Sequence, residues 1–317
     1  MSIYPEIDLN SIKTYSATQR QSKVKVDTIA KPLTAGMSFK KFMDSLPTIL
    51  KAEDIKHVAR AIVNAKKNQK PIIAMIGGHD IKTGCSPILT DLTKNGFITH
   101  LASNGAAGIH DTELARFGHT SEDVGPQLED GSFGMASDTA ALVNQAAILA
   151  KSKKLGFGES VGQLLIEEKG PYLEKALIAQ AFLQQVPYTL HVALGTDIVH
   201  QHPDADGSAI GDASLRDFRI LAHTVSNIGN GGVVLNFGSA VVMPEVFLKA
   251  LSISRNLKND VFNFTTANFD MIQHYRPNIN VVNRPVLKGG DGYAISGHHE
   301  IMIPLMAAMI YEYDKQS

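Results

Sequence analysis

The chain is poor in cysteine and has no long apolar run. Its 317 residues include a single cysteine, Cys85, which excludes an internal disulfide and suits a reducing compartment. No segment approaches the ~20 consecutive apolar residues of a membrane span, and the N-terminal residues show no apolar stretch of signal-peptide length. We therefore expect a cytoplasmic protein with no membrane partner.

An excess of charge of one sign is missing as well. The formal net charge at pH 7 is -1, so electrostatics gives no reason to expect nucleic acid or an anionic membrane as a partner. Hydrophobic residues make up 44% and charged residues 19% of the chain, which is typical of a globular protein rather than a disordered one. We expect a single domain over residues 1–317, with residues 1–50 as an N-terminal extension.

Short apolar runs alternate with helical patterns along the chain. Most of these runs are followed directly by glycine or a polar cluster, which is the strand, turn and helix repeat of a parallel sheet. The sequence therefore predicts an α/β fold with a doubly wound, mainly parallel sheet. The expected strands are 72–76, 98–102, 189–194, 233–237 and 261–265. The expected helices include 54–67, 87–95, 138–151, 172–184, 214–226 and 244–256.

Residues 197–212, DIVHQHPDADGSAIGD, are the most informative segment. They hold four aspartates and two histidines and follow directly on an apolar run. In open α/β sheets, ligands bind where loops leave the carboxyl ends of strands. A buried carboxylate is costly unless it is paired. A loop with this many aspartates after a strand therefore indicates a binding site. The alternative is a solvated loop in which Asp and Gly form turns.

Three further glycine-containing segments compete as sites. Residues 77–84 (GGHDIKTG) and 103–111 (SNGAAGIHD) each follow an expected strand, and glycines there let backbone N–H groups approach a phosphate. Two such loops on consecutive strands resemble a dinucleotide cradle, although each alone also fits a tight turn. Residues 288–300 (KGGDGYAISGHHE) indicate a flexible or ligand-wrapping loop before the last helix.

The twelve histidines invite a metal hypothesis, but the spacings typical of zinc sites, such as HExxH or paired CxxC, are absent. Adjacent histidines point in different directions, so at most one of His298 and His299 would serve a given ion. We expect no metal centre. A metal-dependent hydrolase is kept as an alternative function. Its ligands would come from His200, His202, Asp204 and Asp206.

Taken together, the loops and the order of elements resemble the deoxyhypusine synthase family, including its homospermidine synthase relatives. The most specific match is Asp206-Gly-Ser-Ala-Ile-Gly-Asp212, which is similar to the family's DGSxGD stretch. The turn at 77–84 and the ending Ile301-Met-Ile-Pro-Leu305 are also similar. The resemblance implies a Rossmann-like NAD-binding fold and a homotetramer with sites at subunit interfaces. It also implies polyamine chemistry, in which spermidine is oxidised and its aminobutyl group is transferred through an imine on a lysine.

The resemblance assigns roles to individual positions. It implies that NAD is the cofactor and that one group of residues binds it, while another group carries the reaction. The implied cofactor-binding residues are Gly78, Lys82, Asn104, Asp206, Gly238, Thr266, Ala267, Asp270 and Gly297. The candidate catalytic residues are Lys288, Asp212, His298 and Asp111.

The catalytic half of the family's pattern is altered. The family's reactive lysine falls on Pro285, its tryptophan on Asn283 and a substrate-binding aspartate on Gln273. The nearest amine is Lys288, and a Schiff-base lysine needs a fixed position and a lowered pKa. We therefore expect an NAD-binding, deoxyhypusine synthase-like enzyme that acts on a small amine or amino-acid-like substrate and is not deoxyhypusine synthase itself. A non-catalytic nucleotide-binding paralogue is a further alternative.

Overall fold

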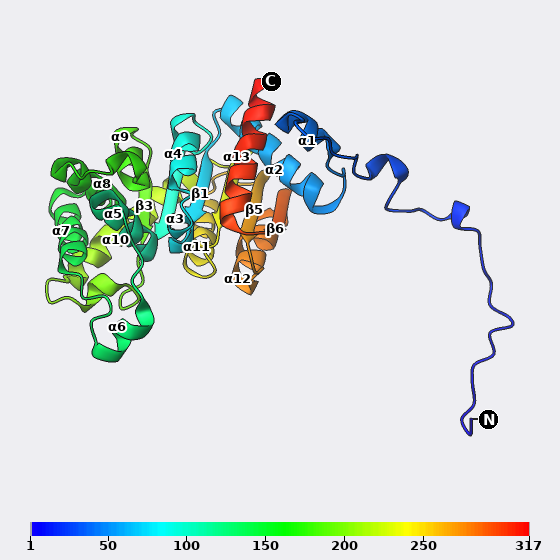
Figure 1. Ribbon diagram of the computed structural model, residues 1–317, viewed down its shortest axis with the longest axis horizontal. Coiled ribbons are helices and arrows are strands. Elements are labelled where there is room, and N and C mark those ends of the chain that lie inside the picture. Colours follow the sequence, from blue (N-terminus) through cyan, green and yellow to red (C-terminus); the bar gives the residue numbers. More distant parts are fainter. Residues whose placement is uncertain (1, 317) are drawn as a thin grey trace. The chain divides into compact units, whose positions relative to one another are not determined.

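The computed structural model describes residues 2–316 (Figure 1). It divides into two compact units, one up to Glu53 and one from Asp54 onward. The first unit has the short 3-10 helices η1 (Ala17–Gln19) and η2 (Val26–Thr28) and the helix α1 (Phe39–Ser45). Ser38 begins α1, because its side chain accepts a hydrogen bond from the Lys41 N–H at 3.3 Å.

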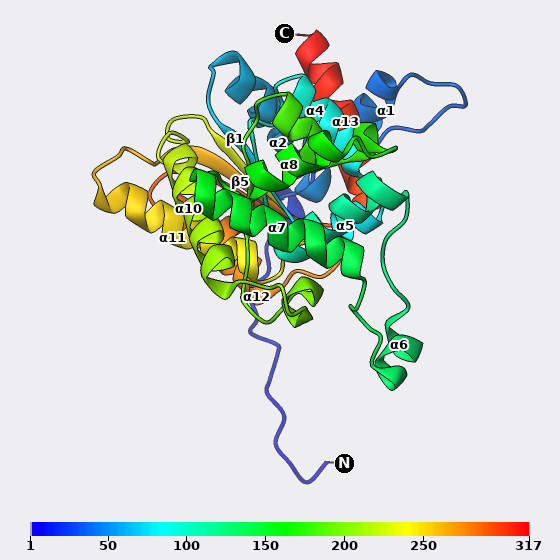
Figure 2. The ribbon, with the colours of Figure 1, turned by 90° about the vertical axis from the view of Figure 1, so that its left-hand side faces the viewer.

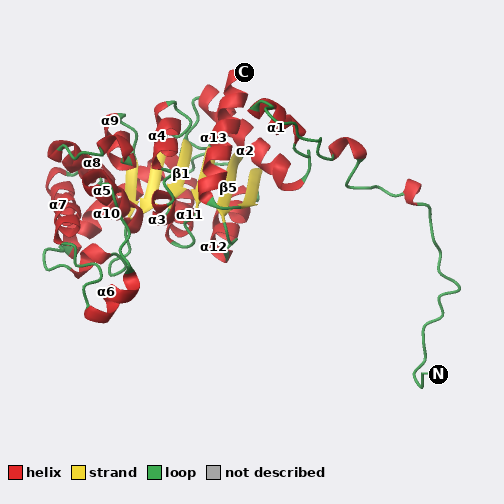
Figure 3. Ribbon diagram, viewed as in Figure 1, coloured by secondary structure: helices red, strands yellow, loops and turns green. Residues whose placement is uncertain are grey.

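The second unit is built on one sheet of six parallel strands, drawn in yellow in Figure 3. The strand order is β3-β2-β1-β4-β5-β6, which is the order of doubly wound dinucleotide-binding folds. The predicted α/β, parallel fold class is therefore confirmed. The strands are β1 (Ile72–Ile76), β2 (His100–Asn104), β3 (Tyr188–His191), β4 (Val233–Phe237), β5 (Phe264–Asp270) and β6 (Gly290–Ser296).

Helices cover both faces of this sheet (Figure 2). On one side α3, α4, α5 and α9 pack with the last helix, whereas α10 and α11 pack together on the other face and α7 and α8 also contact α10, as right-handed crossovers allow. The helices are α2 (Leu50–Lys67), α3 (Gly78–Lys82), α4 (Ser86–Lys94), α5 (Gly105–Phe117), α6 (Val124–Asp130), α7 (Ser137–Lys153), α8 (Phe157–Glu168), α9 (Leu177–Leu183), α10 (Gly207–Val225), α11 (Val242–Asn256), α12 (Tyr275–Pro277) and α13 (His299–Lys315). Short 3-10 or π turns lie at η3 (Leu173–Lys175), η4 (Ile198–Gln201), η5 (Asn278–Asn283) and η6 (Arg284–Val286).

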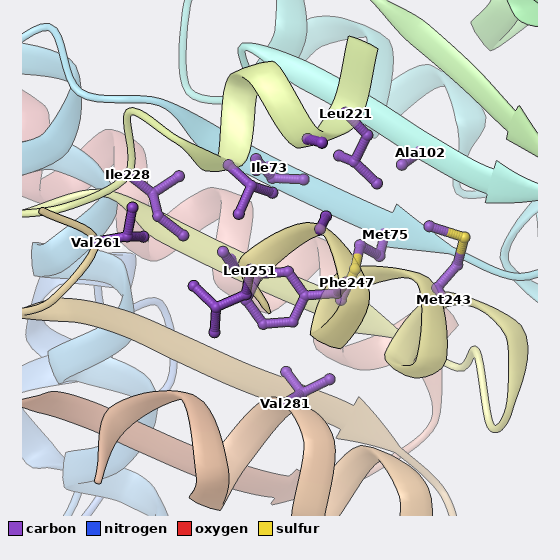
Figure 4. Close-up of a cluster of buried hydrophobic side chains, with 14 of the residues drawn as sticks. Ile73, Met75, Ala102, Leu221, Ile228, Met243, Phe247, Leu251, Val261 and Val281 are labelled. Carbon is purple, nitrogen blue, oxygen red and sulfur yellow. The ribbon is translucent and has the colours of Figure 1, made fainter. Parts of the chain in front are cut away.

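The main core lies between the sheet and the α10–α11 face (Figure 4). Met75 of β1 and Phe247 and Leu251 of α11 are buried there, and Val281 of η5 closes one side. Burying a side chain of this size contributes about 1.5–3 kcal/mol. Because both faces of the sheet are covered, all five residues of β1 and of β4 are buried.

The predicted strands 72–76 and 233–237 are confirmed at both ends. The segment at 288–300 requires a correction, because most of it is not a flexible loop but the edge strand β6, paired with β5. Its glycines permit close backbone contact: a Cβ on Gly292 would lie 1.9 Å from the Val282 carbonyl oxygen. None of the helices in residues 2–316 has the length and apolar composition that a membrane crossing needs.

Candidate functional site

The candidate site lies at the carboxyl ends of the strands, which we call the carboxyl edge. β1 and β4 are neighbours in the sheet, but the chain leaves them toward opposite faces, to α3 and to α11 respectively. Such a switch point is where open α/β sheets bind ligands. Glycines occupy both exits here, Gly77 and Gly78 after β1 and Gly238 after β4.

Gly238 is required by its surroundings. It has φ of +64°, a backbone conformation that favours glycine. A Cβ at this position would also lie 2.3 Å from Cε1 of His299. The missing side chain therefore lets α13 bring His299 against the exits of β1 and β4.

His299 and Asp80 form a fully buried pair at this point. Nδ1 of His299 lies 3.0 Å from Oδ1 of Asp80, and the two side chains are 1% and 0% exposed. On its other side, Nε2 of His299 lies 3.2 Å from the Phe269 carbonyl oxygen. The second oxygen of Asp80 accepts the Gly77 N–H at 2.8 Å. The pair thus joins α3, α13 and the ends of β1 and β5.

The contacts of this pair favour a proton on Nδ1 of His299, which then faces the Asp80 carboxylate as an ion pair. The Phe269 carbonyl can only accept, so Nε2 of His299 carries a hydrogen, and two lone pairs would otherwise face each other across 3.0 Å. Burial raises the pKa of Asp80, and His299 opposes this. Burial alone would lower the pKa of His299, but the adjacent Asp80 raises it above 6.5. Both shifts favour retention of the proton.

A small cavity of about 210 Å³, lined by both charged and apolar side chains, lies on the α3 and α5 side of the carboxyl edge, and we call it the α3–α5 pocket. Lys82, the last residue of α3, lines it together with His110 of α5 and Asp197, which precedes η4. The loop that carries α6 forms another wall, through Glu122 and Phe133. The full lining is Lys82, Ala106, Ile109, His110, Glu113, Ser121, Glu122, Val124, Phe133, Thr196, Asp197 and Ile198.

In this pocket, hydrogen bonds fix the tautomer of neutral His110. The Thr120 hydroxyl donates to Glu113, so it accepts from Nδ1 of His110, 2.7 Å away. Thr139 donates to the other oxygen of Glu113 at 3.1 Å. Although burial opposes the charge, these hydrogen bonds lower the pKa of Glu113. In neutral His110 the hydrogen is therefore on Nδ1, and Nε2 keeps a lone pair that can accept a proton.

A larger groove of about 570 Å³ lies on the opposite face, between α10 and α11, and we call it the α10–α11 groove. It is mostly apolar and is lined by residues that include Leu194, Leu215 and Val241. His191, at the end of β3, borders it but is a core residue, with Nε2 2.9 Å from the Thr189 hydroxyl. Burial lowers the pKa of His191 to about 3, so this ring is neutral.

The structure brings several residues implied by the resemblance to the carboxyl edge. Gly78 begins α3, Asn104 begins α5 by accepting the Ala107 N–H at 3.1 Å, and Gly238 follows β4. Asp270 ends β5 and Gly297 follows β6. Further implied residues belong to three helices that follow strands. Lys82 ends α3, Asp206 and Asp212 lie at the start of α10, and His298 precedes α13.

The acidic segment is organised by its own backbone and by local pairs. Asp206 begins α10 and accepts the N–H groups of Ser208 and Ala209 at 2.8 and 3.1 Å. Asp212 pairs with Arg216 at 3.0 Å on the same helix. Because both carboxylates are at least partly exposed, they remain open to a ligand.

Four other implied residues lie away from this arrangement. Thr266 and Ala267 are fully buried in the middle of β5. Asp111 is also buried, and its two oxygens accept the N–H groups of Leu177 and Ile178 at 2.9 and 2.7 Å, which gives it a role in holding the start of α9. Lys288 is exposed before β6, at the amino end of the sheet, so one chain does not place it beside the carboxyl edge.

The alternative metal ligands have separate partners. Nδ1 of His200 accepts the N–H groups of Gly195 and Asp197, both at 3.2 Å. His202 contacts the Gly134 carbonyl and Asp204 accepts from Asn144. Within residues 2–316, no three His, Cys, Asp or Glu side chains are grouped so that they could hold a metal ion.

The sequence pattern did not single out the Asp80–His299 pair, because its members are far apart in the chain and only the fold brings them together. The contact of His110 with Glu113 could have been predicted from their spacing, since residues three apart on a helix lie on the same side. Asp197 lay within the acidic segment, but its place in the same pocket lining as Lys82 depends on how η4 packs.

Comparisons with known proteins show the fold. No protein-family model and no curated protein matches the sequence. A LOR/SDH protein from Methanococcus maripaludis S2 is 16% identical with a TM-score of 0.51, over 84% of this chain and 71% of that one. AgrE in complex with ornithine and NAD+ is 11% identical with a TM-score of 0.54, over 89% of this chain but 34% of AgrE. A protein assigned to the deoxyhypusine synthases of Entamoeba histolytica is 10% identical with a TM-score of 0.51, over 87% of this chain and 94% of that one.

Proposed function

We propose that this chain is an NAD-binding enzyme that acts on a small amine or amino-acid-like substrate. The observation that carries the proposal is the strand order β3-β2-β1-β4-β5-β6 with glycine exits at the β1–β4 switch point. The similarity to AgrE, solved with ornithine and NAD+, supports both the cofactor and the substrate class.

A groove beside the carboxyl edge has the size for a dinucleotide. The α10–α11 groove of about 570 Å³ is within the range of about 300–1,000 Å³ typical of ligand pockets. NAD would lie in this groove and extend along the carboxyl edge toward Gly78, Asn104, Gly238, Asp270 and Gly297, the positions that the resemblance implies. When bound, NAD would supply a hydride acceptor. The residues of the chain would bind and orient the substrate, and Nε2 of His110 would accept a proton from its amine.

A groove-filling variant tests where the cofactor binds. Gly211 of α10 lines the groove, and a Cβ there would meet no atom within 4 Å. We expect Gly211→Phe to fold normally but to weaken NAD binding at least about ten-fold, because the ring occupies the groove. Calorimetric titration of both proteins with NAD measures this, with an expected wild-type Kd in the micromolar range, about -8 kcal/mol.

Gly125→Phe is the matched control, because a Cβ on Gly125 of α6 would also meet no atom within 4 Å, but this residue does not line the groove. It should bind NAD like the wild type. Equal NAD affinity in the Gly211→Phe variant and the wild type would contradict the groove as the NAD site. If the wild type does not bind NAD at millimolar concentration, NAD is not the cofactor.

We also propose that the chain assembles as a homotetramer. The groove rim carries exposed apolar side chains, with Leu194, Leu215 and Val241 60%, 50% and 49% exposed, and such patches favour burial against another subunit. Assembly would also allow Lys288 of one subunit to approach the carboxyl edge of another. Light scattering should report four times the mass of one chain, and Leu215→Glu should shift it toward smaller species, whereas a monomeric wild type would contradict the assembly.

A further inference from the structure

We propose that the α3–α5 pocket binds a small zwitterionic amino acid, with Asp197 receiving its ammonium group and Lys82 its carboxylate. This inference rests on the proposed function, since it names the substrate class and places it at the carboxyl edge. It depends on the size of the pocket and on two charges that the protein leaves uncompensated.

The pocket is small. Its volume of about 210 Å³ is below the range of about 300–1,000 Å³ that drug-sized ligands need. The lining provides apolar and polar contacts in similar number. The apolar ones come from Ala106, Ile109, Val124, Phe133 and Ile198, and the polar ones from the remaining lining side chains. A single amino acid with a short side chain suits this size and this mixture of surfaces.

Asp197 supplies the negative charge. Its carboxylate is only partly buried and packs against Gly105, where a Cβ would lie 1.9 Å from Oδ2. Among residues 2–316 it has neither a hydrogen-bond donor nor an ion-pair partner. Burial raises the pKa of Asp197, and nearby His200 opposes this. An ammonium group in the pocket would supply both the missing donors and the missing positive charge.

Lys82 supplies the positive charge. It ends α3, its side chain is exposed, and it lines the same pocket. Within the described part of the chain its ammonium forms no ion pair or hydrogen bond, so it is not neutralised by Asp197. Two opposite charges therefore face one small cavity without compensating each other.

This arrangement selects for a ligand with both charges. A diamine would pair with the carboxylates of the lining but would leave the ammonium of Lys82 without an anion, and a simple carboxylate would pair with Lys82 but leave Asp197 without a cation. A zwitterion pairs with both residues at once. Nε2 of His110, whose tautomer is fixed by Thr120, lies in the same lining and would take a proton from the bound ammonium.

The loop of residues 119–135, which carries α6, would control access. In Figures 1 and 2 it stands away from the sheet, and no residue of α6 is buried. Glu122 in the pocket wall accepts the Gly134 N–H at 3.1 Å, and this hydrogen bond connects the two ends of the loop. The pocket can therefore open without disturbing the core.

The test uses ligands of equal carbon-chain length and the full-length protein. L-norvaline carries both charges, pentanoate lacks the ammonium and pentylamine lacks the carboxylate. Calorimetric titration should show L-norvaline, or L-ornithine with its longer amine, binding at least about ten-fold more tightly than either singly charged probe. Asp197→Asn and Lys82→Met should each remove this preference, because each deletes one pairing charge.

Asp130→Asn of α6 and Lys94→Met of α4 are the matched controls, since both are exposed and neither lines the pocket. They should bind the amino acid like the wild type. Equal affinity for all three chain-matched probes would overturn the proposal. Loss of NAD affinity with unchanged amino-acid affinity in Lys82→Met would also overturn it and assign Lys82 to the cofactor.

NAD titration of the same samples separates this inference from the proposed function. Binding of NAD with no binding of amino acids would reject the α3–α5 pocket and leave the NAD proposal standing. Binding of amino acids without NAD would support the pocket and reject the cofactor. If neither binds at millimolar concentration, both proposals fall.

Discussion

Asp80→Ala is expected to lower the free energy of unfolding by about 3–5 kcal/mol, the cost of leaving one member of a buried pair alone. The variant would leave Nδ1 of His299 and the Gly77 N–H without the oxygens that they now contact at 3.0 and 2.8 Å. Urea denaturation of the wild type and the variant measures the difference. Asp130→Ala, at an exposed site on α6, should change stability by no more than about 0.5 kcal/mol.

The double variant Asp80→Leu with His299→Leu shows whether the loss belongs to the pair. Replacing both members of a buried pair by apolar side chains is often nearly neutral, so its loss should be smaller than the sum of the two single losses. Additive losses would mean that the two side chains act independently and would contradict the ion pair.

The same pair predicts a dependence on pH. With His299's pKa raised above 6.5 by Asp80, the folded pair keeps a proton that the unfolded chain loses above about pH 6.5. Above this pH the folded state binds more protons than the unfolded state. The free energy of unfolding therefore falls by about 1.4 kcal/mol per pH unit between about pH 6.5 and the pKa of the folded pair. Urea midpoints between pH 6 and 9 should show this decline in the wild type and less of it in His299→Leu.

Asp217→Ala is expected to cost about 3–5 kcal/mol at pH 5. One oxygen of this fully buried side chain accepts the N–H groups of Leu190 and Gly158 at 2.7 and 3.0 Å, and each donor left unpaired costs about 1–3 kcal/mol. Removing the side chain also leaves a cavity between α10, β3 and the start of α8. Asp212→Ala on the same helix, where the carboxylate is partly exposed, is the control and should lose less than about 1 kcal/mol.

At pH 8 the loss in Asp217→Ala should be smaller. Burial raises the pKa of Asp217 to about 7 against the opposing hydrogen bonds, so the folded state holds its proton more tightly than the unfolded state. The stability that this protonation contributes is full below about pH 4 and is lost as pH rises to about 7, on the order of 4 kcal/mol in all. Urea denaturation at pH 5 and pH 8 that shows the same loss would contradict the raised pKa.

The sequence predicted the interior of the sheet better than its margins. β1 and β4 are almost entirely apolar because helices cover both of their faces, and the glycines that follow each run mark its end as a strand. β6 was missed because its glycines, which let it approach Val282 and Phe264, also favour loops. α5 was missed because its first turn is made of glycine and alanine, although Asn104 caps it.

The candidate site divides in the same way. Glycine loops after apolar strands indicated the carboxyl edge, since topology alone collects strand ends at one side. The charged contacts were not predictable, because Asp80 meets His299 only after α13 returns across the sheet. Likewise, Lys82 and Asp197 reach one cavity from different elements, and no spacing in the sequence encodes that.

β3 is an edge strand of the sheet, and the contacts along its free edge affect how readily the protein aggregates at high concentration. An edge strand with unpaired backbone groups offers a template for another chain and so favours aggregation. Here α10 occupies those groups: Asp217 accepts the Leu190 N–H, and the Ser214 hydroxyl donates to the Leu190 carbonyl at 3.1 Å while accepting the Val192 N–H at 3.0 Å. Two side chains of one helix therefore take the place of a seventh strand and protect this edge from intermolecular pairing.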